Sequence, residues 1–115
     1  MDQVLDQSIL AELRQIPPSD GLSMLKEVVD LFLESAPLRI AQISQSLADA
    51  PKLGFHAHAL KSMSLNLGAK RIVELSQKLE ELSRAGNLKD APALLKDLET
   101  AYNQTKTHLL PLREH

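Results

Sequence analysis

The fold is decided by one long stretch, residues 20–49, which reads DGLSMLKEVVDLFLESAPLRIAQISQSLAD. Its apolar residues recur every three or four positions, which is the period of one face of an α-helix, and the phase does not slip at Pro37. The stretch therefore predicts a single long helix that is kinked near Pro37. A break into two helices there is the alternative, because proline strongly disfavours helix interiors. The apolar stripe consists of Leu22, Leu25, Val29, Phe32, Ala36, Ile40, Ile43 and Leu47.

Other segments of the chain show the same helical period, and prolines or glycines separate them. Because the connections are short, neighbouring helices should run antiparallel. We therefore expect an all-α fold: an antiparallel up-down four-helix bundle with an additional short N-terminal helix laid across one end. The other helices should cover about residues 4–16 (with Leu5, Ile9, Leu13 and Ile16 as the stripe), residues 51–66, residues 69–84, and a last segment that begins near Asn87 or Asp90 and is closed by Pro111.

Composition supports this reading. A chain of 115 residues fits one domain, residues 1–115, and we expect its polar end, residues 112–115, to be frayed. The chain has 23 Leu and 12 Ala against three aromatic residues, which favours helices over strands. The absence of Cys excludes disulfides, thiol nucleophiles and Cys-ligated zinc.

Charge and hydropathy exclude further classes. A net charge of −2 and an isoelectric point near 6.1 give no basic surface for nucleic acid or for an anionic membrane. No apolar run approaches the roughly 18 residues that span a bilayer, and the acidic N-terminus starts no signal peptide. We expect a soluble, cytoplasmic protein, and a monomer, because a complete bundle needs no second chain.

The third predicted helix contains two of the four histidines, and helix rotation separates them. At about 100° per residue, His56 lies some 40° from Leu60 and borders the buried stripe, so we expect a half-buried histidine with a hydrogen bond inside the bundle. His58 lies about 160° from Leu60 and should point into solvent. The buried stripe of this helix consists of Leu53, Ala57, Leu60, Ser64 and Leu67.

The surface around His58 is unusual for a solvated helix face. Spacings of three, four and seven residues place a lysine, small residues and two apolar residues beside the imidazole. Small residues leave room for a partner, and exposed apolar groups suggest a docking surface. A nucleophilic histidine needs access, a neutral ring and help with the charge it acquires. The alternative is an ordinary polar surface residue. The neighbours are Gly54, Phe55, Lys61, Ser62 and Leu65.

Residues 58–69, which read HALKSMSLNLGA, resemble the signature of histidine-containing phosphotransfer (HPt) domains. That signature is roughly His-x-Leu-Lys-Gly-Ser-x-x-x-x-Gly-Ala. Residues 32–37 look like the preceding helix of the family and residues 75–86 like the following one, so the resemblance covers roughly residues 20–105. It implies a four-helix bundle with an exposed reactive histidine on one helix.

The resemblance also implies a role for each matching residue. His58 would be the phosphoacceptor, and Lys61 would stabilise the charge of the phosphoryl group. Ser62 departs from the family's glycine, but its small side chain could donate a hydrogen bond to a phosphoryl oxygen. Independently of the resemblance, their spacing on the exposed face leads us to expect that Gly54, Phe55 and Leu65 contact the partner.

The function implied is that of a phosphorelay carrier rather than an enzyme. A receiver domain of a response regulator or of a hybrid sensor histidine kinase would pass its aspartyl phosphate to His58, and another receiver would accept it. The chain shows no Gly-rich ATP-binding element and no carboxylate cluster around His58. We therefore expect no cofactor on this domain and Mg²⁺ on the receiver.

Two other functions remain open. A non-catalytic helical adaptor could use the same exposed face, although the presence of both His58 and Lys61 argues against it. A metal-binding bundle is disfavoured because His56 and His58 diverge by about 200°, whereas helical metal ligands are three or four residues apart. His108 is best explained as a favourable charge at a helix C-terminus.

Overall fold

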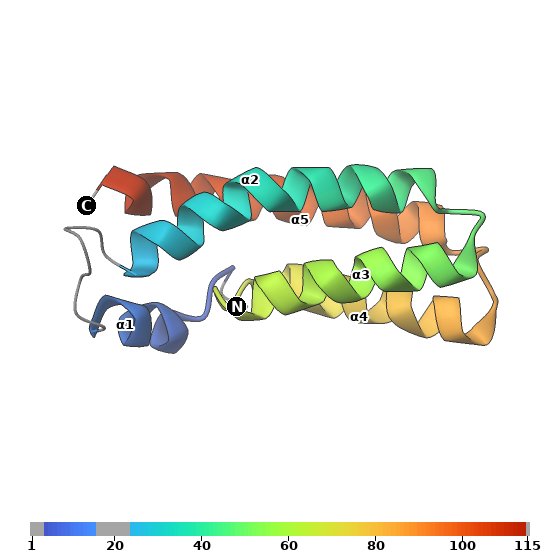
Figure 1. Ribbon diagram of the computed structural model, residues 1–115, viewed down its shortest axis with the longest axis horizontal. Coiled ribbons are helices and arrows are strands. Elements are labelled where there is room, and N and C mark those ends of the chain that lie inside the picture. The colour runs from blue at the N-terminus through green and yellow to red at the C-terminus, as the bar shows by residue number, and fades with distance from the viewer. Residues whose placement is uncertain (1–3, 16–23, 115) are drawn as a thin grey trace.

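A computed structural model describes residues 4–15 and 24–114. Within these ranges the chain is entirely helical (Figure 1). Short turns join the first and the last long helix of the bundle to the two central helices. The elements are α1 (Gln7–Gln15), α2 (Met24–Gln45), α3 (Ala50–Leu65), α4 (Lys70–Ala85), α5 (Ala91–Leu109) and the 3₁₀ helix η1 (Leu110–Glu114).

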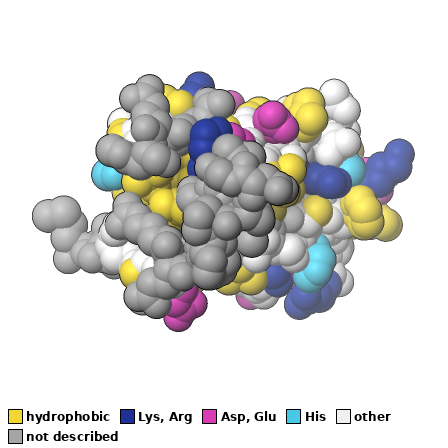
Figure 2. Space-filling view, turned by 60° about the vertical axis from the view of Figure 1, so that its left-hand side comes forward, with side chains coloured by type: hydrophobic (Ala, Val, Ile, Leu, Met, Phe, Trp, Pro, Cys, Tyr) yellow, Lys and Arg dark blue, Asp and Glu magenta, His cyan; other side chains and the backbone are white. Residues whose placement is uncertain are grey.

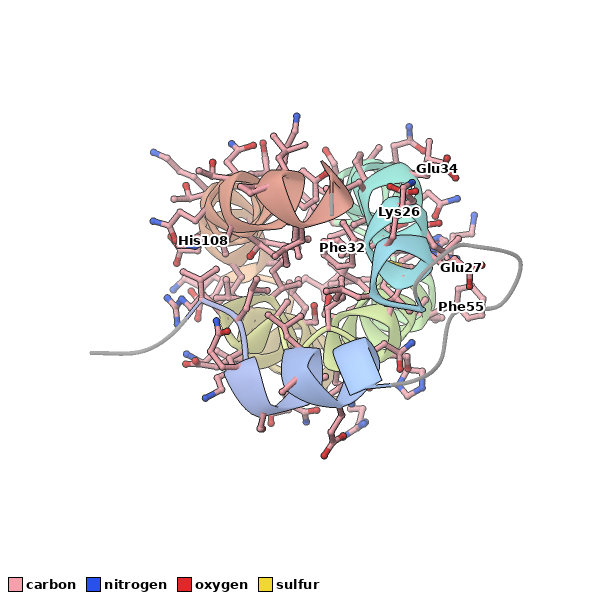
Figure 3. All side chains as sticks on the ribbon, turned by 90° about the vertical axis from the view of Figure 1, so that its left-hand side faces the viewer. Lys26, Glu27, Phe32, Glu34, Phe55 and His108 are labelled. Carbon is pink, nitrogen blue, oxygen red and sulfur yellow. The ribbon has the colours of Figure 1, made fainter. Side chains whose placement is uncertain are left out.

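The helices α2 to α5 form the predicted four-helix bundle. Each contacts the next along the chain, and α5 closes the ring by contacting α2. Figure 3 looks along the bundle and shows α1 lying across the end of α3 and α4. The all-α fold, the antiparallel bundle and the additional N-terminal helix are therefore confirmed.

The helix α2 is one continuous helix through Pro37, so the alternative of two helices is wrong. Pro37 is exposed and its neighbour Ala36 is fully buried. The proline ring therefore lies on the outward side, where it does not disturb the core packing. Of the predicted stripe, Leu22 lies outside the described residues, Ile40 and Leu47 are partly buried, and the other five are buried.

Local signals at the helix ends match the sequence. Asp49 caps α3, because its Oδ1 accepts a hydrogen bond of 3.2 Å from the backbone N–H of Lys52. Gly86 ends α4 in the left-handed conformation, at φ +68°. Pro92 lies in the first turn of α5, where its missing N–H is tolerated. The bounds of α3 and α4 differ from those predicted by one residue at each end, whereas α2 ends at Gln45, several residues before the predicted end near Asp49.

The core is built from the predicted stripes. In α3 all four predicted positions from Leu53 to Ser64 are fully buried, and Leu67 follows in the turn. The rings of Phe32 and Tyr102 lie 6.0 Å apart between α2 and α5. In the N-terminal segment Leu5 is buried, but Leu10 rather than Ile9 is the buried residue of α1. The side chains of Leu13 and Ile16 lie outside the described residues.

The C-terminal end contains one element that the sequence did not predict. Residues 112–114, which we expected to be frayed, belong to η1, which contacts both α2 and α5. Leu112 is partly buried and packs against the core. This apolar residue supplies the packing that a purely polar tail would lack. His115 lies outside the described residues.

Candidate functional site

His58 lies on the outer side of α3, as the rotation argument predicts. Its side chain is 63% exposed. The rest of α3 fixes this orientation, because Leu53, Ala57 and Leu60 are fully buried on the opposite side. The imidazole leans toward α4, where its Nδ1 lies 3.2 Å from Oε2 of Glu80.

Glu80 is a buried carboxylate beneath the histidine. Its side chain is 6% exposed, although it carries a charge that usually lies at a protein surface. Three basic side chains surround it. Lys61 Nζ lies 2.7 Å from its Oε1, and Arg84 Nη2 donates a hydrogen bond of 3.2 Å to the same Oε2 that faces His58.

These partners decide the protonation of Glu80. Burial alone would raise the pKa of this carboxyl group. The hydrogen bonds and positive charge of Lys61, together with the hydrogen bond from His58, oppose burial and leave the pKa of Glu80 below its ordinary value. Glu80 is therefore a carboxylate at neutral pH, and it accepts hydrogen bonds rather than donating them.

Lys61 is held in place from two sides. Its side chain is only 18% exposed, and besides Glu80 it donates a hydrogen bond of 2.9 Å to Oε1 of Gln77. The amide nitrogen of Gln77 in turn donates to Glu81 at 3.2 Å. An ammonium group has three N–H donors, and the hydrogen bond to Gln77 uses one of them.

Sequence reasoning missed Glu80 as a site residue. A signal was present: Glu80 follows Ile72, Leu75, Ser76 and Leu79 at the spacing of one buried helix face, all of them buried in α4. A carboxylate on such a face demands partners. Which partners it has depends on the register between α3 and α4, which the sequence pattern does not reveal.

His56 is half-buried, as predicted, but its hydrogen bond goes to Arg39 of α2 rather than into the interior of the bundle. Arg39 Nη1 lies 2.8 Å from Nδ1 of His56. Because a guanidinium can only donate, Nδ1 is the acceptor and the ring is neutral. Burial, and then the charges of Arg39 and Lys52, lower the pKa of His56.

Phe55 is exposed, and its ring lies beside both His56 and Arg39. Its side chain is 66% exposed, and its ring meets that of His56 edge-on, with centroids 5.3 Å apart. The guanidinium carbon of Arg39 lies 5.8 Å from the centre of the phenyl ring, within cation–π range. Figure 3 shows Phe55 projecting away from the bundle, whereas Phe32 lies between the helices.

The remaining predicted contact residues differ in their surroundings. Ser62 is exposed, and Leu65 is 51% exposed at the end of α3. Gly54 is half-buried and faces α4, where an added Cβ would collide with the hydroxyl of Ser83. Close packing between α3 and α4 therefore requires a glycine at position 54. Its predicted contact with a partner stays a prediction.

The large exposed hydrophobic side chains are not scattered evenly. In the described part of the chain, all but one of them lie on α2 and α3. Figure 2 shows hydrophobic, basic and histidine side chains lying side by side on the right-hand side of the view. The large exposed hydrophobic residues are Phe55 and Leu65 of α3, Leu31 and Leu38 of α2, and the exception, Leu110 of η1.

Other features of the described residues lie away from this surface. His108 is exposed in the last turn of α5, as its sequence position predicts, and Figure 3 places it on the opposite side of the bundle from Phe55. No cluster of three or more His, Asp or Glu side chains in residues 4–15 and 24–114 could hold a metal ion. None of the helices described is long and apolar enough to cross a membrane.

Comparison with known proteins gives consistent matches. The family model for the Hpt domain matches residues 27–108. Histidine-containing phosphotransfer protein 2 of Arabidopsis thaliana is 27% identical in an alignment over 103 residues that covers 85% of this chain and 66% of that protein. The chain thus spans slightly less than two thirds of that relative.

Solved structures match more completely. The crystal structure of histidine-containing phosphotransfer protein B from Pseudomonas aeruginosa superposes with a TM-score of 0.87 and 27% identity, over 96% of this chain and 95% of the other. Histidine-containing phosphotransfer protein MtHPt2 from Medicago truncatula has a TM-score of 0.77 and 23% identity, over 96% of this chain and 80% of the other. The second match supports the fold.

Proposed function

We propose, from the premise that this chain belongs to the Hpt domain family of phosphorelay phosphotransfer proteins, that His58 carries the phosphoryl group. The histidine would take it from the aspartyl phosphate of one receiver domain and pass it to another. One observation supports the assignment most strongly: Nδ1 of the exposed His58 imidazole is hydrogen-bonded to the buried carboxylate of Glu80. No other histidine with described surroundings has this arrangement.

The contact with Glu80 selects the reacting nitrogen. Because Glu80 is a carboxylate, Nδ1 of His58 must donate the hydrogen bond and therefore carries the ring proton. The other nitrogen, Nε2, then has the free lone pair. Because Nδ1 faces Glu80 and the side chain is 63% exposed, Nε2 is the nitrogen that we expect a partner to reach. Nε2 is thus the proposed nucleophile.

Positive charge near the ring supports the transfer. As Nε2 forms its bond to phosphorus, the P–O bond of the aspartyl phosphate breaks and its electron pair stays on the aspartate. Such a step depends on positioning and on neutralising the phosphoryl oxygens. An N–H of Lys61 that Gln77 does not engage is the proposed donor to one oxygen, and the exposed hydroxyl of Ser62 is a second candidate.

The receiver would dock on the apolar surface beside His58. Phe55 and Leu65 flank the histidine on α3, and Leu31 and Leu38 extend the same kind of surface onto α2. A partner that brings its aspartate to Nε2 must cover part of this area. Burying exposed apolar side chains would then contribute to affinity.

The partner would also supply the metal. Phosphoryl transfer commonly uses Mg²⁺ to neutralise phosphoryl oxygens, and Glu80 is already engaged by Lys61, Arg84 and His58. We therefore assign Mg²⁺ to the receiver and no cofactor to this domain. The chain would act as a monomeric carrier, without a catalytic cycle of its own, between response-regulator receivers or a hybrid sensor kinase and a receiver.

The test is direct transfer. Receiver domains encoded in the same genome are charged with radioactive acetyl phosphate, freed of it, and mixed with this protein. Label that is acid-labile and base-stable should appear on the wild type and be absent from His58→Gln. His108→Gln is the matched control, because it removes an exposed histidine on the opposite side. Binding without any label would instead support an adaptor, and label on His58→Gln would overturn the assignment.

A further inference from the structure

We infer that Glu80 keeps the Nδ1 proton on the ring of His58 while the phosphoryl group is attached, and so sets the pH range over which that group can be passed on. Glu80 is in this view a positioning residue: it touches the ring on the side away from phosphorus. The inference rests on the proposed function of His58, and it concerns the second half of the relay, the discharge to an accepting receiver.

The proton matters because of the leaving group. After the first transfer Nε2 is bonded to phosphorus and Nδ1 still carries its proton, so the ring is an imidazolium. When an aspartate of the next receiver attacks phosphorus, the Nε2–P bond breaks and its electron pair returns to Nε2. With the Nδ1 proton in place the ring leaves as neutral imidazole. Without it the ring would leave as an imidazolate anion, a far poorer leaving group.

The structure gives Glu80 the means to hold that proton. Its Oε2 lies 3.2 Å from Nδ1, and the carboxylate, though not the ring, is buried away from water. A carboxylate beside an imidazolium stabilises the charged form of the ring. Phosphorylation creates this positive charge on the ring, so the contact gains strength when the relay protein is loaded.

Other charges around the pair act on Glu80 and on the ring. Lys61 of α3 lies against Oε1, and Arg84 of α4 shares Oε2 with the histidine. Both keep the carboxylate ionised and fixed, while their positive charge partly opposes the imidazolium. Glu81 is linked to Lys61 through Gln77. Oε2 is the acceptor that faces Nδ1 directly, so we expect its hydrogen bond to affect the ring more than the positive charges of Lys61 and Arg84 do.

Glu80→Gln is the informative substitution. It keeps the size of the side chain but replaces the carboxylate by a neutral amide, which accepts a weaker hydrogen bond or turns its NH₂ toward a deprotonated Nδ1. The phosphorylated ring should then lose its Nδ1 proton at a pH about one unit lower, the difference between a charged and a neutral hydrogen bond. Onward transfer should decline at correspondingly lower pH.

The experiment measures discharge alone. Protein phosphorylated by a charged receiver is purified and mixed with an unphosphorylated receiver between about pH 6 and pH 10, and the loss of label is followed. Wild type, Glu80→Gln and Glu74→Gln use the same receiver, so its own pH dependence cancels. Glu74 is a matched control because it is an exposed carboxylate on the same helix, paired with Arg71 and Lys78.

The result expected is a discharge profile shifted downward by about one pH unit in Glu80→Gln and unshifted in Glu74→Gln. Coinciding profiles for all three proteins would overturn the inference. Failure of the wild type to take label at His58 would instead refute the proposed function. If Glu80→Gln does not fold, ¹⁵N NMR of the unphosphorylated wild type decides: the inference requires the proton on Nδ1 of His58, and a ring protonated on Nε2 alone would overturn it.

Discussion

Glu80 lies beneath His58, with Oε2 of the buried carboxylate 3.2 Å from Nδ1 of the exposed imidazole. This relationship joins α3 to α4 and makes the two nitrogens of the ring unequal. Nδ1 faces the carboxylate, while the side chain as a whole is 63% exposed.

Removal of Lys61 should affect both chemistry and stability. Lys61→Ala leaves Oε1 of a buried carboxylate without its ammonium partner, which we expect to lower the free energy of unfolding by about 1–3 kcal/mol. Transfer to His58 should slow, because a donor for the phosphoryl oxygens is lost. Urea titration and label-transfer rates check the two effects. Lys78→Ala, which removes an exposed lysine from α4, should change neither.

Acid should weaken the fold through His56. The pKa of His56 is lower in the folded protein than in the unfolded chain. Between these two pKa values the unfolded chain binds more protons, so stability rises with pH. The contribution of His56 to stability is therefore present above its ordinary pKa of 6.5 and is lost as the pH falls below that value. We expect the free energy of unfolding to fall between about pH 7.5 and pH 5.5.

The same titration identifies the residue. His56→Gln should reduce this decrease, because it removes the group that must otherwise be kept neutral beside Arg39. His108→Gln should leave the decrease unchanged, since His108 is exposed at the end of α5. An identical pH dependence in wild type and His56→Gln would show that His56 is not the source.

Gly54 should be sensitive to the smallest enlargement. Alanine usually stabilises a helix interior by up to about 1 kcal/mol relative to glycine, but here its Cβ would collide with the hydroxyl of Ser83. We expect Gly54→Ala to destabilise the bundle by about 1 kcal/mol instead. The same change made in a Ser83→Ala background should be less harmful, and equal effects in both backgrounds would argue against this contact.

Charge on the apolar surface should block docking. Phe55→Asp and Leu65→Asp should each slow transfer from a charged receiver by about tenfold or more, as for buried anchors of an interface. Leu110→Asp is the matched control, because Leu110 is also an exposed leucine but lies in η1. Unchanged rates in Phe55→Asp and Leu65→Asp with every receiver that charges the wild type would refute the proposed surface.

Much of this architecture could be predicted from periodicity. The spacing of apolar residues depends only on helix geometry, so it identified the buried stripe of α3 and the outward position of His58. Phe32 was expected on the core stripe of α2 for the same reason, and it is buried. The continuity of α2 through Pro37 was favoured because the phase of its stripe does not change.

What periodicity could not predict depends on contacts between helices. The pairing of His58 with Glu80, and of Gly54 with Ser83, follows from the register of α3 against α4. That register is fixed by the turn between them, in which Gly68 adopts φ +66° and receives a hydrogen bond from the N–H of Asp6. The helix η1 was not predicted because it is too short to show a period, and Leu112 is its one residue that packs against the core.

The most direct test of the central claim is to identify the nitrogen that carries phosphorus. Protein labelled with ¹⁵N in its histidines is phosphorylated by a charged receiver, and coupling between ³¹P and the ring nitrogens is measured by NMR. The structure predicts phosphorus on Nε2 of His58, with the proton on Nδ1 facing Glu80. Phosphorus on Nδ1 of His58, or on another residue, would contradict the account.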